Sequence, residues 1–190
     1  MKFSTVLLCP FRIMMVCTVI SVSFGVIIER NHTKIARKTV KRFNRYSKLS
    51  PREAYKLEIS ILERLQQTPS PCNKIHVQEL LNQHDKSLTF TTKWAGQTLD
   101  RGHKDFCRIP LDDLIEQANC IDEHLYRAGV RHVDQPKSGK NMALHGKHLT
   151  LIDFDIATLD DNPVLPEKYQ KKDIAITQRF VYNYYRQHCK

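Results

Sequence analysis

The sequence lacks several features that would point to common classes of protein. Its six cysteines include no CxxC pair and show no regular spacing, so a zinc site is not expected. No apolar run continues without interruption for the length that a membrane-spanning helix needs. Neither an internal repeat nor a low-complexity segment is present. A chain of 190 residues with an ordinary globular composition is therefore expected to form one compact unit, with room for two small lobes.

The cysteine pattern and the N-terminus bear on location. Irregular spacing in a chain of this size does not imply a disulfide framework, and Cys120 lies in an apolar helical pattern typical of a small core residue. We therefore expect a reducing, cytoplasmic environment. Secretion stays open as an alternative, because residues 1–25 contain a lysine followed by a largely apolar stretch, as in a signal peptide. Pro10 and Arg12 interrupt that stretch.

The charge of the chain is unbalanced. It carries 30 Lys and Arg against 20 Asp and Glu, a formal net charge of +10. This excess favours an acidic partner, a nucleotide phosphate or a membrane surface, without choosing among them. The basic residues gather at 30–56, as either a solvated face or a phosphate-binding surface. That segment has no interleaved aromatic residues and no recognisable nucleic-acid module, so nucleic acid is not expected as a partner.

Local patterns in the first part of the chain predict strands followed by a helix. The β-branched residues at 19–28 are broken by one glycine and predict two short strands, and the alternation at 34–43 predicts a third. Ser50 is followed by a proline and, three positions on, by a glutamate, which together form a capping box. Apolar residues at helical spacing then predict an amphipathic helix over 51–67.

The second part of the chain continues the mixture. Two strands, a helix, a hairpin and a last helix are expected at 76–83, 87–96, 110–128, 141–144 with 149–154, and 174–184. A Trp-Ala-Gly sequence ends the second of these strands and suits a linker between two lobes. Gly129 ends the helix expected at 110–128. The fold class expected from these patterns is α+β.

Five short motifs follow one another along the chain. They are "SFGVI", "IARK", "LEISIL", "HVDQPKSGKN" and "IDFDIA", at 23–27, 35–38, 57–62, 132–141 and 152–157. In this order they resemble motifs of the eukaryotic-type protein kinases: the end of the glycine-rich loop, the V-A-I-K strand, the glutamate-bearing helix, the H-R-D-x-x-x-x-N loop and the D-F-G segment. The resemblance covers nearly the whole chain and is closest to a small atypical or truncated member.

The resemblance implies a two-lobe kinase-like fold. Residues 17–95 would form the N-lobe and residues 96–190 a reduced helical C-lobe, after an apolar segment at 1–16. Only the sequence "LPE" resembles the A-P-E signature, and it comes too early for a full activation segment.

A nucleotide site is implied in the first half of the chain. Gly25 would lie near the phosphates, and Lys38 would bind the α- and β-phosphates with Glu58 holding its ammonium group in place. The alternative is a solvated strand lysine and an unrelated helix carboxylate.

Catalytic and metal-binding residues are implied in the second half. Asp134 would accept the proton of the substrate hydroxyl, and Lys137 would neutralise the transferred phosphoryl group. Asn141 and Asp153 would bind Mg²⁺. His132 would be a packed structural residue. Turn chemistry for Asp134 and Asn141, and simple exposure for Lys137, are the alternatives.

Three departures from the kinase motifs keep other functions open. Gly25 is the one loop glycine present, two extra residues separate Asp134 from Asn141, and Asp155 replaces the glycine of D-F-G. The leading hypothesis is an ATP- and Mg²⁺-dependent protein kinase acting on Ser/Thr hydroxyls. The alternatives are a pseudokinase that acts as a binding scaffold, a small secreted basic protein, and a kinase for a non-protein hydroxyl.

Overall fold

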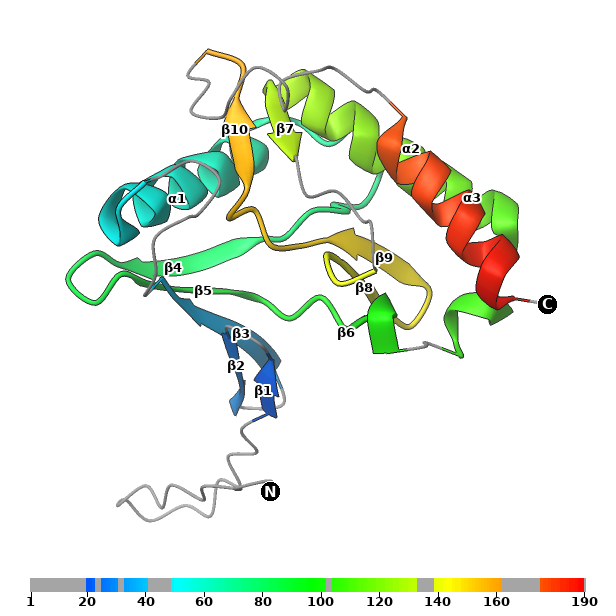
Figure 1. The fold of residues 1–190 in the computed structure, drawn as a ribbon, viewed down its shortest axis with the longest axis horizontal. Helices are drawn as coiled ribbons and strands as arrows, with labels where there is room; N and C mark the ends of the chain where they lie inside the picture. Colours follow the sequence, from blue (N-terminus) through cyan, green and yellow to red (C-terminus); the bar gives the residue numbers. More distant parts are fainter. Residues whose placement is uncertain are drawn as a thin grey trace.

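The computed structural model describes most of the chain. The described residues are 20–22, 25–30, 33–40, 49–101, 104–132, 139–161 and 175–189. Within them the fold is mixed α+β, with three α-helices and small antiparallel sheets (Figure 1). The expected α+β class is confirmed, whereas the two-lobe kinase-like arrangement stays a prediction.

Five strands form the largest sheet, in the order β1-β2-β3-β5-β4 with every pair antiparallel. They are β1 (Ile20–Val22), β2 (Gly25–Arg30), β3 (Thr33–Thr39), β4 (Leu80–His84) and β5 (Thr89–Lys93). The prediction of two short strands broken near a glycine is confirmed, since β2 begins at Gly25. The central strand β3 places Lys38 opposite Gly25 on one side and Phe90 on the other.

Helix α1 spans Pro51–Gln67, the range that the sequence predicts. Its capping box is formed: the Glu53 N–H donates to Ser50 Oγ at 3.3 Å, and the Ser50 N–H donates to Glu53 Oε2 at 2.8 Å. The buried face of α1 carries Tyr55 and Leu62 together with one carboxylate, Glu58. This helix contacts β4, β10 and α2, so its buried face lies between the large sheet and the rest of the fold (Figure 1).

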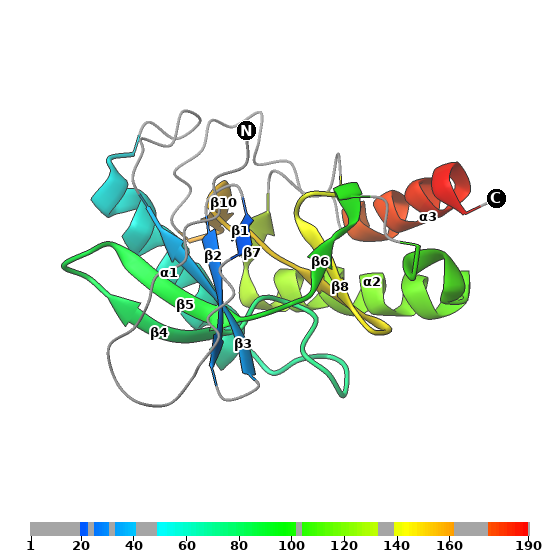
Figure 2. The ribbon, with the colours of Figure 1, turned by 90° about the horizontal axis from the view of Figure 1, so that it is seen from below.

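Helices α2 (Leu111–Ala128) and α3 (Ile176–His188) pack side by side (Figure 2). Helix α2 ends at Gly129 as predicted, in the left-handed conformation with φ 63°. The buried carboxylate of Asp122 in α2 accepts hydrogen bonds from the N–H groups of Thr177 and Gln178, each at 3.2 Å. It therefore satisfies donors in the first turn of α3.

The short strands complete the fold as one three-stranded and one two-stranded sheet. They are β6 (Gln97–Thr98), β7 (Val130–His132), β8 (Met142–His145), β9 (His148–Leu151) and β10 (Ala157–Leu159). The predicted hairpin is confirmed as β8 and β9. Before β6, Gly96 has φ +110°, and a Cβ atom there would lie 2.0 Å from the carbonyl oxygen of Leu144. The chain can make this approach only with glycine.

Two disulfides join segments that are remote in sequence. Cys72 pairs with Cys120 of α2, and Cys107 pairs with Cys189, directly after α3. The spacing of the cysteines did not imply a disulfide framework, but these four cysteines form one. Spacing along the chain could not reveal pairs that only the packing of the helices brings together, at Cα–Cα distances of 6.0 and 5.0 Å. Cys120 is buried, as predicted, but as a disulfide partner.

The end of α1 is held against α2 by a second contact. His124 of α2 is buried, and its Nε2 lies 3.0 Å from the carbonyl oxygens of both Leu65 and Thr68. Together with the disulfide of Cys72, this contact fixes the C-terminal turn of α1 and the loop that follows it. Among the described residues, no helix has both the length and the apolar character to cross a membrane.

Candidate functional site

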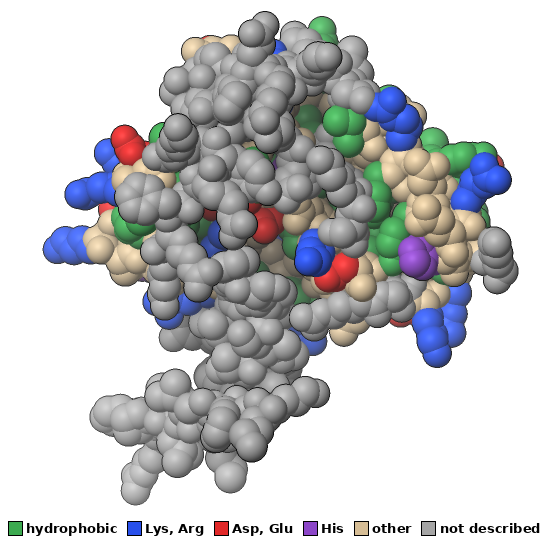
Figure 3. Space-filling model, viewed as in Figure 1, with side chains coloured by type: hydrophobic (Ala, Val, Ile, Leu, Met, Phe, Trp, Pro, Cys, Tyr) green, Lys and Arg blue, Asp and Glu red, His purple; other side chains and the backbone are tan. Residues whose placement is uncertain are grey.

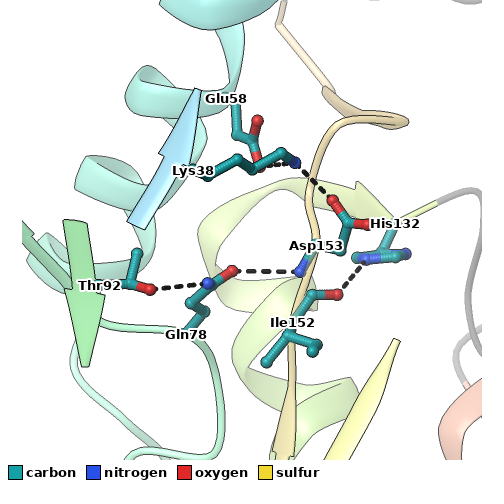
Figure 4. Close-up of polar contacts among 7 residues, drawn as sticks. All are labelled: Lys38, Glu58, Gln78, Thr92, His132, Ile152 and Asp153. Atoms are coloured by element: carbon teal, nitrogen blue, oxygen red, sulfur yellow. Dashed lines mark hydrogen bonds and ion pairs between the residues drawn. The ribbon is translucent and has the colours of Figure 1, made fainter. Parts of the chain in front are cut away.

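Three charged side chains from distant segments meet at one place (Figure 4). Lys38 Nζ on β3 lies 2.8 Å from Glu58 Oε1 on α1 and 2.5 Å from Asp153 Oδ1, just after β9. The structure thus brings together two residues predicted for nucleotide binding and one predicted for the metal. The arrangement is a lysine held between two carboxylates.

The local folding of each segment explains why these side chains meet. Alternation along β3 leaves Arg37 exposed and turns Lys38 toward the interior. Glu58 lies on the buried face of α1, one turn from Tyr55 and Leu62. The exposed fractions of the side chains are 1% for Glu58, 18% for Lys38 and 36% for Asp153. Asp153 is therefore the member of the group that solvent reaches most readily.

The charges of the three groups shift one another's pKa. Burial opposes the charged form of Lys38, but the carboxylates of Asp153 and Glu58 outweigh it and raise the pKa of the lysine above its ordinary value. Burial raises the pKa of Glu58 to about 7, against the opposing effect of Lys38. Burial also acts to raise the pKa of Asp153, but the charge and hydrogen bond of Lys38 lower it overall. Lys38 and Asp153 are thus ionised at neutral pH, while Glu58 titrates near it.

Asp153 has an unusual backbone conformation. Its φ is 65°, in the left-handed region that residues other than glycine rarely adopt. The peptide group before it is held by two side chains: the Asp153 N–H donates to Gln78 Oε1 at 3.1 Å, and His132 Nε2 lies 3.3 Å from the Ile152 carbonyl oxygen (Figure 4). A strained residue held in this way is characteristic of functional sites.

His132 and Phe154 form the apolar support of this segment. Both are buried, and their rings meet edge to face with centroids 4.9 Å apart. The prediction that His132 is a packed residue is confirmed. Phe154 of the "IDFD" sequence is buried, whereas Asp153 before it is half-buried and Asp155 after it is exposed.

Two residues that could supply oxygen ligands to a metal ion, Asn141 and Asp153, lie on segments that are joined by a hydrogen bond. The Asn141 carbonyl accepts a hydrogen bond from the Ile152 N–H at 2.9 Å, so Asn141 is adjacent to the segment that carries Asp153. Asp155 is also near, because its charge raises the pKa of both Lys38 and Glu58. Among the residues that the structure describes, no three His, Cys, Asp or Glu side chains are grouped so as to hold a metal ion.

The remaining predicted residues are placed only in part. Gly25 pairs with Lys38 across β2 and β3, which puts its backbone beside the backbone of the lysine. Asp134 and Lys137 fall outside the described residues, in the segment between β7 and β8. Sequence reasoning missed Gln78, which accepts a hydrogen bond from the Asp153 N–H, and Thr92, which accepts one from the Gln78 side chain. Neither lies in a recognisable motif, so no local signal could have found them.

On the face shown in Figure 3, the Lys and Arg side chains of the described residues lie apart from one another and form no single patch. They lie around the edges of the molecule and also near its centre, beside acidic side chains. Some of the described arginines are in ion pairs with exposed carboxylates, among them Arg64 with Asp161 and Arg108 with Asp105.

No protein-family model matches the chain, and no curated protein sequence matches it either. The resemblance to protein kinases therefore stays an expectation from the motifs of the sequence.

Proposed function

We propose that the chain is a kinase-like enzyme that uses ATP and Mg²⁺ to phosphorylate Ser or Thr hydroxyls of a protein substrate. The observation that carries the proposal is the contact of Lys38 with both Glu58 and Asp153. Phosphoryl transfer depends mainly on positioning and charge neutralisation. A lysine fixed by one buried carboxylate, beside a more exposed carboxylate, suits the binding of a phosphate chain and its metal ion.

The residues present fit Mg²⁺. This ion prefers oxygen ligands and is commonly bound by one or two protein groups together with substrate phosphates and water. The partly exposed carboxylate of Asp153 and the amide oxygen of Asn141 are donors of this kind, and a cluster of three protein ligands is not required. When bound, Mg²⁺ would neutralise negative charge that develops on the phosphates.

The chain's own residues would divide the remaining work. Lys38 would bind phosphate oxygens, and Glu58 would keep the ammonium group in position. Asp134 would accept the proton of the attacking hydroxyl, and Lys137 would offset charge on the transferred group. Both of these roles are carried over from the resemblance to the kinase catalytic loop.

A second candidate function is a pseudokinase, a scaffold with a weak nucleotide site. One observation favours it: Asp153 already contacts Lys38 at 2.5 Å, so a nucleotide has to compete with this ion pair. The departures in the glycine-rich and catalytic loops point the same way.

The two disulfides change the proposed location. Stable disulfides form mainly in oxidising compartments, so we infer that the chain folds in the secretory pathway or outside the cell. This favours the secreted alternative over the cytoplasmic one. It is compatible with kinase activity wherever ATP is available.

The test is calorimetric titration of the full chain with ATP, in Mg²⁺ and in EDTA, for the wild type and Asp153→Ala. We expect binding in Mg²⁺ that is tighter than in EDTA, and an Asp153→Ala variant that has lost this difference. Asp105→Ala removes an exposed carboxylate away from the site and is the matched control. A folded wild type that does not bind ATP would overturn the proposal, and binding without any transfer to a Ser/Thr substrate would favour the pseudokinase.

A further inference from the structure

We propose that Gln78 is a positioning residue that sets the orientation of the Asp153 carboxylate toward the metal ion of the proposed nucleotide site. This inference rests on the proposed function. Gln78 belongs to none of the motifs that resemble protein kinases, and it lies 75 positions before Asp153 in the sequence.

Gln78 connects Asp153 to the centre of the molecule through three hydrogen bonds. Its backbone N–H donates to the Leu151 carbonyl at 3.0 Å, and its side-chain Oε1 accepts from the Asp153 N–H at 3.1 Å. Its side-chain Nε2 donates to Thr92 Oγ1 at 2.9 Å. Thr92 is a buried residue of β5, so the amide is anchored to the large sheet (Figure 4).

This anchoring matters because of the backbone of Asp153. A φ of 65° costs free energy in a residue with a side chain, so the conformation needs contacts that hold it. Gln78 holds the N–H side of the Ile152–Asp153 peptide group, while His132 is within reach of its carbonyl. The Asp153 side chain is attached to Cα, which is bonded directly to the nitrogen of this peptide group. Rotation of the peptide group would therefore change the direction of the carboxylate.

The same contact links the metal carboxylate to the strand next to the nucleotide lysine. Thr92 is on β5, which pairs with β3, the strand that carries Lys38. Gln78 therefore ties Asp153 to the sheet from which Lys38 extends, independently of the ion pair between the two charged side chains. Loss of Gln78 would remove this tie between the Asp153 backbone and β5, so the carboxylate would be held less firmly in position for a metal ion.

The test compares ATP affinity of wild type, Gln78→Leu and Gln78→Glu by calorimetry, in Mg²⁺ and in EDTA. We expect Gln78→Leu to weaken binding in Mg²⁺ about tenfold, as removal of groups that orient a metal ligand commonly does, with binding in EDTA unchanged. Gln78→Glu keeps an acceptor for the Asp153 N–H and should recover most of the affinity. Gln66→Leu, which removes an exposed amide bonded to the Leu80 carbonyl, is the matched control.

Each outcome decides a different claim. Equal affinity of Gln78→Leu and wild type in Mg²⁺, or an equal loss in Mg²⁺ and EDTA, would overturn the positioning role. A wild type that shows no Mg²⁺-dependent binding would instead overturn the proposed function on which it rests. Should Gln78→Leu fail to fold, Thr92→Val removes only the anchor of the amide; a loss confined to Mg²⁺ supports the role, and unchanged affinity contradicts it.

Discussion

Glu58 on α1 is almost completely buried, with the ammonium group of Lys38 2.8 Å from its carboxylate. A carboxylate in this position depends on its partner, because an isolated buried charge is costly. The pair therefore links the stability of the fold to the chemistry of the site.

Replacement of Lys38 by Met should destabilise the protein. It leaves the Glu58 carboxylate buried without its cation, and breaking a buried pair of this kind costs roughly 3 kcal/mol. The free energy of unfolding in urea at pH 8 is the measurement. Arg37→Met, an exposed neighbour on the same strand, should change it little. Equal effects of the two substitutions would contradict the importance of the pair.

Stability should also depend on pH through Glu58. Its pKa is about 7 in the folded protein, above the ordinary value of 4.5, so the folded state holds a proton that the unfolded chain releases. The contribution of Glu58 to the free energy of unfolding therefore falls as pH rises from about 4.5 to 7. Relative to Glu58→Gln, which cannot ionise, the thermal midpoint of the wild type should fall between pH 5 and pH 8. A difference that stays constant over this range would argue against the raised pKa.

Substitution of Gly96 by alanine should be among the most damaging single changes. The new methyl group would lie 2.0 Å from the Leu144 carbonyl oxygen in a backbone with φ +110°. We expect a loss of roughly 3–5 kcal/mol, from overpacking and backbone strain together. Gly146→Ala is the control, because φ is +61° there but no atom lies within 4 Å, and it should cost only about 1 kcal/mol. Chemical denaturation of both variants measures the difference.

The disulfide between Cys72 and Cys120 should contribute strongly to stability. It closes a loop with a sequence separation of 48, for which chain entropy predicts a stabilisation of about 4 kcal/mol. The double substitution of both cysteines by serine should lower the free energy of unfolding by that amount under non-reducing conditions. Peptide mass spectrometry without reduction checks the pairing itself. Peptides that show both cysteines alkylated before reduction would contradict it.

Asp134→Ala should reduce phosphate transfer while leaving the fold and ATP binding intact. A general base contributes about 10²- to 10⁴-fold to such reactions. Transfer from ATP to a Ser/Thr peptide library, measured by mass spectrometry, gives the comparison. Asp112→Ala, at an exposed carboxylate in the first turn of α2, is the control. Unchanged transfer in Asp134→Ala would remove this residue from the mechanism.

Local signals allowed the helices to be predicted closely. The capping box at Ser50 and the glycine at position 129 mark ends of helices within a few residues, so α1 and α2 lie where the sequence places them. The predicted strand at 76–83 was less accurate, because β4 begins at Leu80. Val77 pairs instead with Leu151, a contact between remote segments that no local pattern contains.

The charged site could be predicted in part, from motif resemblance and not from local helix or strand signals. Lys38, Glu58 and Asp153 were found through motif resemblance, which carries spatial information that periodicity lacks. The supporting residue Gln78 and the pairing of Cys72 with Cys120 have no motif. They depend on which loop packs against which strand or helix, and this is decided only when the whole chain folds.

The attachment of α1 to α2 limits how the site can be controlled. The last turn of α1 and the loop after it are held by the disulfide between Cys72 and Cys120 and by the contact of His124. The helix that carries Glu58 is therefore attached to α2 at this end. A movement of α1 that separates Glu58 from Lys38 would therefore have to carry α2 with it or break the disulfide.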